Sequence, residues 1–305
     1  MIGLSALACV YANVEVLSIL GADMITRSID PDLIRGWFKP RPADSHKGDF
    51  GNVAVLGGAP GMAGAALLAA RAALWLGAGR VYAGLLDERI GVDFNAPELM
   101  LCSPERALAV DTPACLVLGP GLGMSAAARG WLEAALNTSL PLLLDADALN
   151  LIAAESALCE AVQERRGPTL LTPHPGEAAR LLGVGAADIQ ADRVASLTAL
   201  AERYPVGIVL KGAHSLTHFP GSPIWRNDTG NSGMAAPGMG DVLAGMIAAL
   251  CAQGLSLEQS AVAGVHLHGA AGDAAVLAGR GPTGLTASEV ARAARELLNR
   301  WAGSA

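Results

Sequence analysis

The stretch "NDTGNSGMAAPGMGDVLAGM", residues 227–246, joins a glycine-rich run to an apolar one. Four of its glycines precede Asp241, and Val242 and Met246 follow at the spacing of one helix face. Glycine carries an entropic cost, so a chain keeps it where the backbone turns sharply or approaches another group closely. A glycine-rich turn that opens a helix exposes unpaired amides at the positive helix end, where phosphate binds readily. The stretch therefore predicts an anion-binding loop in front of an apolar helix.

Asp241 has two interpretations. As an N-cap it would stabilise its helix by about 1 kcal/mol. Beside a phosphate site, however, a carboxylate repels the anion unless it takes part in the chemistry, for example by accepting a proton from a hydroxyl group that attacks phosphorus. We favour the second interpretation, in which Asp241 is a general base.

The rest of the chain alternates short apolar runs with Ala- and Leu-rich stretches, a pattern typical of parallel strands and crossover helices. The predicted strands are residues 52–57, 80–86, 115–119, 141–146, 169–172 and 206–212, and a hairpin is predicted for 214–219 and 222–227. The predicted helices include 63–76, 125–136, 191–204, 241–253, 257–278 and 286–301. We therefore expect an α/β fold built as one main domain.

Composition limits the classes of function. The chain has 305 residues, of which 52% are hydrophobic and 16% charged, so it can bury a large core. A net charge of -7 lacks the basic field that nucleic acid or an anionic membrane surface would require. Five cysteines without a CxxC pair predict neither a disulfide framework nor a zinc site. These features favour a small-molecule partner and a reducing, cytoplasmic location.

The N-terminal run "MIGLSALACVYANVEVLSILGA", residues 1–22, could be mistaken for a signal peptide or membrane anchor. No Lys or Arg precedes it, and Glu15 interrupts it after 14 residues, which are too few to span a bilayer. We predict a linker remnant or packed arm over residues 1–36.

Polar motifs follow five of the predicted strands. They are "GGAPGMAGA" (residues 57–65), "GPGLG" (119–123), "DADALN" (145–150), "TPHPGE" (172–177) and "KGAHS" (211–215). One glycine-rich turn after a strand is most often structural. In an open parallel sheet, however, ligands bind at the carboxyl ends of the strands, so five such motifs at one edge predict a binding site.

This set of motifs resembles the ADP- or ATP-dependent NAD(P)H-hydrate dehydratases, a branch of the ribokinase-like fold. The resemblance also rests on "HKGDFG" at residues 46–51 and on the glycine-rich string quoted first, and it runs from about Trp37 to the end of the chain. Pro237 and Met239 stand where the family often has smaller residues. The resemblance implies a ribokinase-like three-layer α/β/α architecture with a central, mostly parallel sheet, and a dehydratase domain over residues 37–305.

The implied activity is that of a hydro-lyase acting on (6S)-NAD(P)HX, the hydrate formed when water adds to NADH or NADPH. The nucleotide phosphorylates the ring hydroxyl, phosphate leaves more readily than hydroxide, and NAD(P)H is restored while ADP becomes AMP. A ribokinase-like small-molecule kinase and a non-enzymatic nucleotide-binding protein are the alternatives.

The implied partners are the hydrated dinucleotide and ADP or ATP with Mg²⁺, without nucleic acid or membrane. We expect a cytoplasmic homo-oligomer, a homotetramer. Many bacterial family members carry an N-terminal epimerase domain, and only about 36 residues precede the resemblance here, so we expect no epimerase activity.

The resemblance assigns roles to individual residues, with Asp241 as the catalytic aspartate. The anion site would consist of Asn231, Gly233, Gly238, Met239 and Gly240. The nucleotide would contact Lys211, Gly212, Ala213, His214, Ser215 and Gly240, and the hydrate would contact Gly64, Ala65, Gly123, His174 and Asp241. Glu177 would hold Mg²⁺ through its water shell.

Several of these residues have simpler interpretations. Without the resemblance, His174 is a turn histidine with a satisfied hydrogen bond and Lys211 a solvated strand tip. Asp145 and Asp147 either cap the next helix or belong to the site, and the sequence leaves both open.

His266 and His268 stand two residues apart on a predicted helix, which points them to nearly opposite faces. They are therefore not expected to form a metal pair. We expect His268 to pack or form a hydrogen bond near the site.

Overall fold

The apolar runs form one ten-stranded sheet within residues 25–110 and 114–303, the part of the chain described by the computed structural model. The strands are β1 (Thr26–Ser28), β2 (Asn52–Gly57), β3 (Arg80–Leu85), β4 (Met100–Cys102), β5 (Ala114–Leu118), β6 (Leu142–Leu144), β7 (Thr169–Leu171), β8 (Gly207–Leu210), β9 (Leu216–His218) and β10 (Ile224–Arg226). Their order in the sheet is β1-β10-β9-β8-β7-β6-β5-β2-β3-β4. Neighbouring strands are parallel except where β9 pairs with β8 and β10, so the expectation of a mostly parallel sheet is confirmed.

Helices cover both faces of this sheet. They are α1 (Pro31–Trp37), α2 (Ala63–Trp75), α3 (Pro104–Leu108), α4 (Ala126–Leu136), α5 (Asp147–Ala154), α6 (Ser156–Glu164), α7 (Pro175–Leu182), α8 (Ala186–Ala191), α9 (Arg193–Arg203), α10 (Met239–Ala252), α11 (Leu257–Leu277) and α12 (Ala287–Trp301). Two short 3-10 helices, η1 (Lys47–Phe50) and η2 (Ser232–Met234), lie in the loops.

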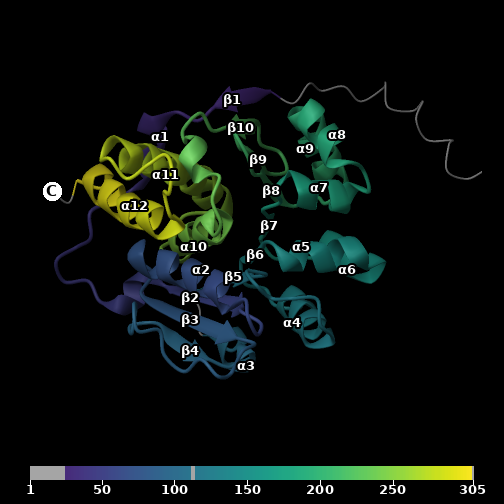
Figure 1. Ribbon diagram of the computed structural model, residues 1–305, viewed down its shortest axis with the longest axis horizontal. Coiled ribbons are helices and arrows are strands. Elements are labelled where there is room, and N and C mark those ends of the chain that lie inside the picture. Colours follow the sequence, from purple (N-terminus) through teal and green to yellow (C-terminus); the bar gives the residue numbers. More distant parts are fainter. Residues whose placement is uncertain (1–24, 111–113, 304–305) are drawn as a thin grey trace, which may run out of the picture.

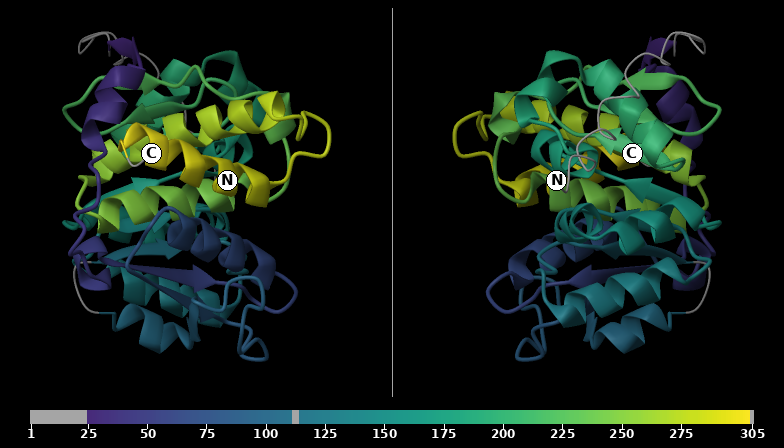
Figure 2. Two further views of the ribbon diagram at one scale, coloured as in Figure 1. Left: turned by 90° about the vertical axis from the view of Figure 1, so that its left-hand side faces the viewer. Right: turned by 90° about the vertical axis from the view of Figure 1, so that its right-hand side faces the viewer.

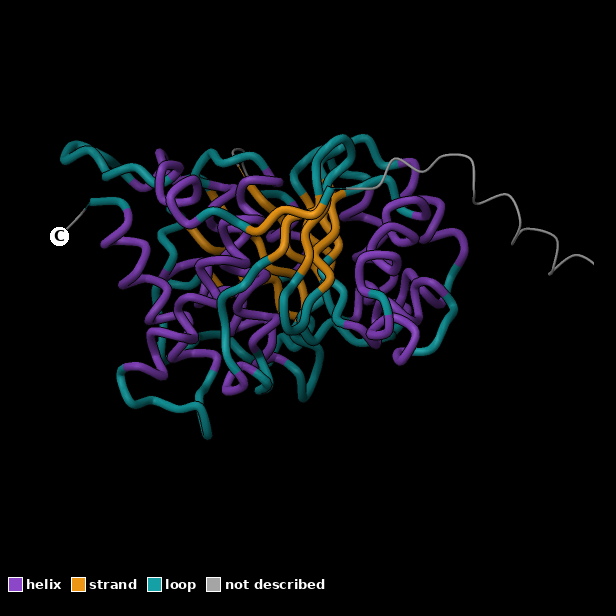
Figure 3. Tube along the Cα trace, turned by 90° about the horizontal axis from the view of Figure 1, so that it is seen from above, coloured by secondary structure: helices purple, strands orange, loops and turns teal. Residues whose placement is uncertain are grey.

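The layers follow from the alternation of side chains along each strand. In β2, Val53 and Val55 face one core and Ala54 and Leu56 face the other. The first core contains α2, α10, α11 and α12, and the second contains α4 to α9 (Figure 1). Figure 3 shows the strands between these two groups of helices, and the side views of Figure 2 bring each group to the front in turn. The three-layer α/β/α architecture is thus confirmed.

The chain reverses its direction of progress across the sheet next to β2. It runs outward from β2 through β3 to β4, returns to β5 on the other side of β2, and then continues in order to β9. Ligands bind at such switch points in open parallel sheets. The loops after β2 and β5 are therefore brought together at the edge where the polar motifs lie.

The predicted elements are confirmed, with ends that differ from the observed ones by at most two residues. One difference matters: α10 begins at Met239, and its N-cap is Gly238 in the left-handed region at φ 85°. The N-cap interpretation of Asp241 is therefore wrong, because Asp241 lies inside the first helical turn.

The predicted arm is only partly covered by the described residues, which exclude 1–24. Within the remainder, β1 pairs with β10, and Ile29 and Ile34 are buried in a small apolar cluster. The domain boundary at residue 37 stays a prediction. No helix in the described ranges is long and apolar enough to cross a membrane.

Close packing of α10 on α2 positions the N-terminus of α10. Small residues make this approach possible: α2 presents Ala66, Ala69 and Ala73, all fully buried, and a Cβ added at Gly245 of α10 would overlap the carbonyl oxygen of Ala69. Two helix backbones can approach closely only where such side chains are absent or small. Gly245 therefore contributes to the placement of α10.

Two helical glycines should respond oppositely to alanine. Gly245→Ala should lower the free energy of unfolding by about 1–3 kcal/mol, because the added methyl group overpacks the α2–α10 contact. Gly130→Ala in α4, where an added Cβ meets nothing within 4 Å, should raise it by up to about 1 kcal/mol through helix propensity. Urea unfolding of both variants measures the difference. An equal loss in both would contradict the close-approach explanation.

Candidate active site

A cavity of about 760 Å³ opens at the carboxyl ends of β6, β7 and β8, bounded by the loop before α10, the first turn of α10 and the middle of α11. Most of the predicted site residues line it: His174, Glu177, Lys211, Gly212, Ala213, His214, Ser215, Asn231, Met239, Gly240 and Asp241. Gly64, Ala65, Gly123, Gly233 and Gly238, all among the described residues, do not line it. The structure thus brings the predicted nucleotide residues and Asp241 together around one space.

Lys211 lies at the centre of a buried charge cluster. Its Nζ is 2.5 Å from Oδ1 of Asp145 and 3.8 Å from Oε2 of Glu177, and both carboxylates are almost completely buried. Burial alone would lower the pKa of Lys211, but the Asp145 and Glu177 carboxylates outweigh it and the pKa is raised. Lys211 is therefore a fixed cation and not a solvated strand tip.

Two carboxyl groups of the site have raised pKa values. Burial raises the pKa of Glu177 to about 7, against the opposing effect of Lys211. Burial, followed by repulsion from Asp145, raises the pKa of Asp241 to about 6. A carboxyl group whose pKa lies near the working pH can both accept and release a proton, as a general base requires.

The N-terminus of α10 opens into the cavity. Its N-cap is a glycine, so no side chain caps the first amides, and Met239, Gly240 and Asp241 all line the cavity. A Cβ at Gly240 would lie 3.0 Å from Nζ of Lys211, so glycine is needed for the ammonium group to approach the helix end. Free amides beside a cation form a site for a phosphoryl group.

The loop before α10 is held by Asp273 of α11, a residue that the sequence analysis did not identify. Its carboxylate accepts hydrogen bonds from Nδ2 of Asn231 and the amide of Gly230, each at 2.9 Å. Asn231 in turn accepts a hydrogen bond from the amide of Gly233 through Oδ1 at 2.9 Å. These contacts fix the shape of the glycine-rich loop.

His174 and Glu177 cap α7 reciprocally. Nδ1 of His174 accepts a hydrogen bond from the amide of Gly176 at 2.9 Å, and Oε2 of Glu177 accepts one from the amide of His174 at 2.7 Å. The two interpretations of His174 are therefore compatible: its ring caps α7 and also lines the cavity.

These contacts also limit how Mg²⁺ could bind. No group of three His, Cys, Asp or Glu side chains within the described ranges could hold a metal ion. Glu177 is engaged by His174, and Lys211 lies between Glu177 and Asp145. These contacts do not fit an ion held directly by several carboxylates, and the water-mediated role that the resemblance implies for Glu177 stays a prediction.

Three of the predicted hydrate residues, Gly64, Ala65 and Gly123, lie outside this cavity, at the neighbouring switch point. The amide of Ala59 donates to the carbonyl oxygen of Gly121 at 2.6 Å, which joins the loop before Gly64 to the loop that contains Gly123. The amide of Gly123 donates to Oδ2 of Asp147 at 2.8 Å. Asp147 therefore contacts this loop, while Asp145, two residues earlier, contacts Lys211.

The two histidines of α11 point in different directions, as predicted. His266 stacks on Trp301 with ring centroids 5.8 Å apart, whereas His268 lines the cavity. Burial, and then the charge of Lys211, lower the pKa of His268 to about 4, so its ring is neutral near pH 7.

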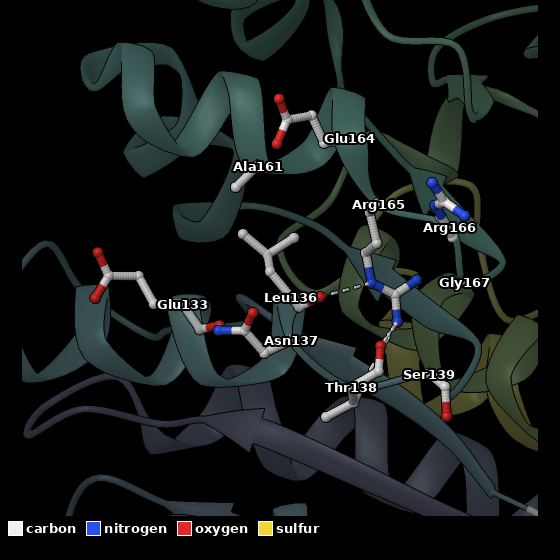
Figure 4. A pocket seen from close by; sticks show the side chains of 10 residues that line it. All are labelled: Glu133, Leu136, Asn137, Thr138, Ser139, Ala161, Glu164, Arg165, Arg166 and Gly167. Atoms are coloured by element: carbon white, nitrogen blue, oxygen red, sulfur yellow. Dashed lines mark hydrogen bonds between the residues drawn. The ribbon is translucent and has the colours of Figure 1, made fainter.

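A second cavity, of about 660 Å³, lies at the opposite, amino ends of β6 and β7 (Figure 4). Figure 4 shows Arg165 pointing between Leu136 and Thr138, and its guanidinium donates to their carbonyl oxygens at 3.2 and 2.9 Å. Arg165 thus has a structural role, because it satisfies carbonyl oxygens at the end of α4 and in the loop before β6. None of the predicted site residues lines this cavity.

Comparisons with known proteins agree with this geometry. The fold is ribokinase-like, and the structure matches a crystal structure of the ADP/ATP-dependent NAD(P)H-hydrate dehydratase of Bacillus subtilis, co-crystallised with ATP and Mg²⁺, with a TM-score of 0.75 and 30% identity over 88% of this chain and 96% of that one. The chain belongs to the NAD(P)H-hydrate dehydratase family, whose model matches residues 53–294.

Two relatives are similar to the chain in sequence. The chain is 43% identical over 267 residues to the ADP-dependent (S)-NAD(P)H-hydrate dehydratase of Neisseria meningitidis, covering 86% of this chain and 90% of that one. It is 41% identical over 268 residues to the bifunctional NAD(P)H-hydrate repair enzyme of Escherichia coli, covering 86% of this chain and 50% of that one. The chain thus spans about half the length of this bifunctional relative.

The raised pKa of Asp241 predicts an unusual stability effect. Because the folded pKa lies above the unfolded one, ionised Asp241 opposes folding, and its cost grows as the pH rises through about 4 to 6. Asp241→Asn should therefore raise the free energy of unfolding by about 1–3 kcal/mol near pH 8 and leave it unchanged near pH 4. Urea unfolding across this pH range measures the gain.

A matched variant gives the opposite sign. Asp93 is buried, but Arg71 lies 2.5 Å away and its hydrogen bond holds the pKa of Asp93 below its usual value. Asp93→Asn should lose stability at the higher pH. If Asp241→Asn loses stability in the same way, the unfavourable environment assigned to the Asp241 carboxylate is wrong.

Proposed function

We propose that the chain catalyses the nucleotide-dependent dehydration of (6S)-NAD(P)HX to NAD(P)H, with ADP as the phosphoryl donor. The observation that carries the proposal is the juxtaposition of Asp241, Lys211 and the open N-terminus of α10 around one cavity. The relative from Neisseria meningitidis, similar over nearly its whole length, has the same activity in its name.

In the first step, the ring hydroxyl of the hydrate attacks the terminal phosphorus of the nucleotide. Asp241 accepts the hydroxyl proton, and AMP leaves when ADP is the donor. The amides at the start of α10 and the ammonium group of Lys211 stabilise the charge on the transferring phosphoryl oxygens. The pKa of Asp241, raised to about 6 by burial and then by Asp145, suits a group that accepts this proton.

In the second step, the phosphorylated hydrate loses phosphate. The lone pair of the ring nitrogen expels the phosphate, and loss of the neighbouring ring proton restores the dihydronicotinamide. Phosphate replaces hydroxide as the leaving group, which is the reason for consuming a nucleotide.

The two substrates approach Asp241 from different sides. The nucleotide binds along residues 211–215 and at Gly240, inside the cavity. The hydrate binds at Gly64, Ala65 and Gly123, at the switch point next to Asp147, with His174 completing its site. Asp147, which accepts a hydrogen bond from the Gly123 amide, also contributes to the raised pKa of Asp241, after burial and Asp145, and this supports a hydrate site close to the base.

Other parts of the proposal concern the assembly. Glu177 would hold Mg²⁺ through water, and the ion would neutralise charge on the nucleotide phosphates. The enzyme acts in the cytoplasm as a homotetramer. ADP, and less effectively ATP, serves as donor.

A direct assay tests the reaction. Hydrated NADH incubated with the protein, Mg²⁺ and ADP should recover the absorbance band of NADH, with one AMP formed for each NADH. Recovery without any nucleotide would overturn the phosphorylation mechanism. A stable phosphorylated product, with no NADH, would instead identify a kinase.

Asp241→Asn separates catalysis from binding. Asparagine preserves the shape but removes the base, so turnover should fall by roughly a hundred- to ten-thousandfold. Affinity for ADP with Mg²⁺, measured by calorimetry on the same preparation, should stay equal or rise slightly, because a negative charge near the phosphates is lost. Turnover close to that of the wild type would remove Asp241 from the mechanism.

A further inference from the structure

Backbone hydrogen bonds fix the main chain of Lys211, but they do not fix the position of its side chain. Its amide donates to the carbonyl oxygen of Pro173 at 2.8 Å, and its own carbonyl oxygen accepts a hydrogen bond from Arg193 at 3.2 Å. These contacts fix where the side chain starts. A lysine side chain has four further rotatable bonds, so its ammonium group needs another contact to be fixed in place.

Asp145 supplies that contact. Its Oδ1 lies 2.5 Å from Nζ of Lys211, while the other carboxylate of the cluster, that of Glu177, is 3.8 Å away and already accepts a hydrogen bond from His174. Asp145 is 1% exposed and Lys211 is partly buried, which limits the competition of water for this ion pair.

The backbone around Asp145 is itself rigid. Its amide donates to the carbonyl oxygen of Leu118 at 3.1 Å, and its carbonyl oxygen accepts a hydrogen bond from the amide of Ala148 at 3.1 Å. The next residue, Ala146, has φ 50° and ψ -116°, a conformation that L-residues rarely adopt and that is retained only where surrounding contacts enforce it. This turn directs Asp145 to Lys211 and Asp147 to Gly123.

The ion pair with Asp145 holds the ammonium group of Lys211 beside the first turn of α10, where a transferred phosphoryl group would bind. An added Cβ on Gly240 would lie 3.0 Å from Nζ of Lys211 and 3.7 Å from Oδ2 of Asp145, so both groups adjoin the first turn of α10. An ammonium group has three donors, and the pair with Asp145 uses one of them. The remaining donors can reach a phosphoryl group at the amides of α10.

We propose that Asp145 is a positioning residue that aims the Lys211 ammonium group at the phosphoryl group transferred at the N-terminus of α10. It acts through Lys211, although it also lines the cavity. The expected effect on kcat rests on the proposed function, whereas the expected effect on the position of the Lys211 side chain does not.

A double-mutant cycle tests the kinetic consequence. Asp145→Asn should lower kcat by about ten- to a hundredfold, since misplacing a catalytic group by 1 Å costs about this much. Affinity for ADP with Mg²⁺ should stay equal or increase, because a carboxylate near the phosphates is lost. Lys211→Met should lower kcat at least as much, and adding Asp145→Asn to it should lower kcat no further. Multiplying effects in the double variant would overturn the proposal.

Asp147→Asn is the matched control. It removes the same charge two residues along, but Asp147 contacts the Gly123 amide and not Lys211. Its effect on kcat should therefore multiply with that of Lys211→Met. The stoichiometry of ADP binding, compared with the wild type, shows that each variant remains folded. If neither Asp147→Asn nor Asp145→Asn lowers kcat further in the Lys211→Met background, the coupling is not specific to Asp145 and the proposal fails.

Crystal structures of the wild type and the two single Asp variants decide the structural consequence independently of activity. Lys211 should leave its place beside Gly240, or occupy several rotamers, in Asp145→Asn, and should keep its place in Asp147→Asn. An unmoved Lys211 in Asp145→Asn would overturn the proposal. A wild-type protein without dehydratase activity would overturn the proposed function instead, and the crystal structures would still decide where Asp145 holds Lys211.

Discussion

The buried ammonium group of Lys211 ties together parts of the site that are distant in sequence. It stands at the end of β8, and its carboxylate partners come from the end of β6 and from α7. Burying such charges is unfavourable unless they are closely paired, so these segments are constrained to one arrangement. Lys211 faces three acidic groups, counting Asp241, and Arg180 adds a weaker positive contribution at Glu177. Burial, together with this excess of negative charge, accounts for the raised pKa values of Glu177 and Asp241.

This excess of negative charge explains the glycine-rich stretch before α10. A nucleotide phosphate approaching Lys211 also approaches three carboxyl groups, so the ammonium group alone gives little net attraction. Backbone amides add positive potential without adding a buried cation, and the left-handed turn at Gly238 leaves those of Met239 and Gly240 uncapped at the cavity. Glycine at 240 also lets the ammonium group come close to them. The loop and the charge cluster are therefore complementary parts of one anion site.

The sequence predicted the sheet well because its central strands are buried on both faces and appear as continuous apolar runs. The sequence also predicted correctly that the polar motifs after β6, β7 and β8 lie around one cavity, since the carboxyl ends of parallel strands meet at one edge. It left the role of Asp145 open, because the pair with Lys211 joins residues 66 positions apart and depends on the unusual backbone of Ala146. The same rule about strand ends brings the two residues near each other, since they follow the buried strands β6 and β8 on either side of β7. Asp273 had no such signal, because it lies within an apolar helix.

The geometry bears differently on the two halves of the proposed reaction. Phosphoryl transfer requires a base, a cation and amide donors, and Asp241, Lys211 and the first turn of α10 provide them. Any ribokinase-like kinase has the same requirement, so these groups define phosphorylation and not its outcome. Expulsion of phosphate needs only the lone pair of the ring nitrogen beside the phosphorylated carbon, which belongs to the substrate. What distinguishes a dehydratase from a kinase on this fold is therefore recognition of the hydrated ring, which we propose takes place at the switch-point loops beside Asp147, where Gly123 is held.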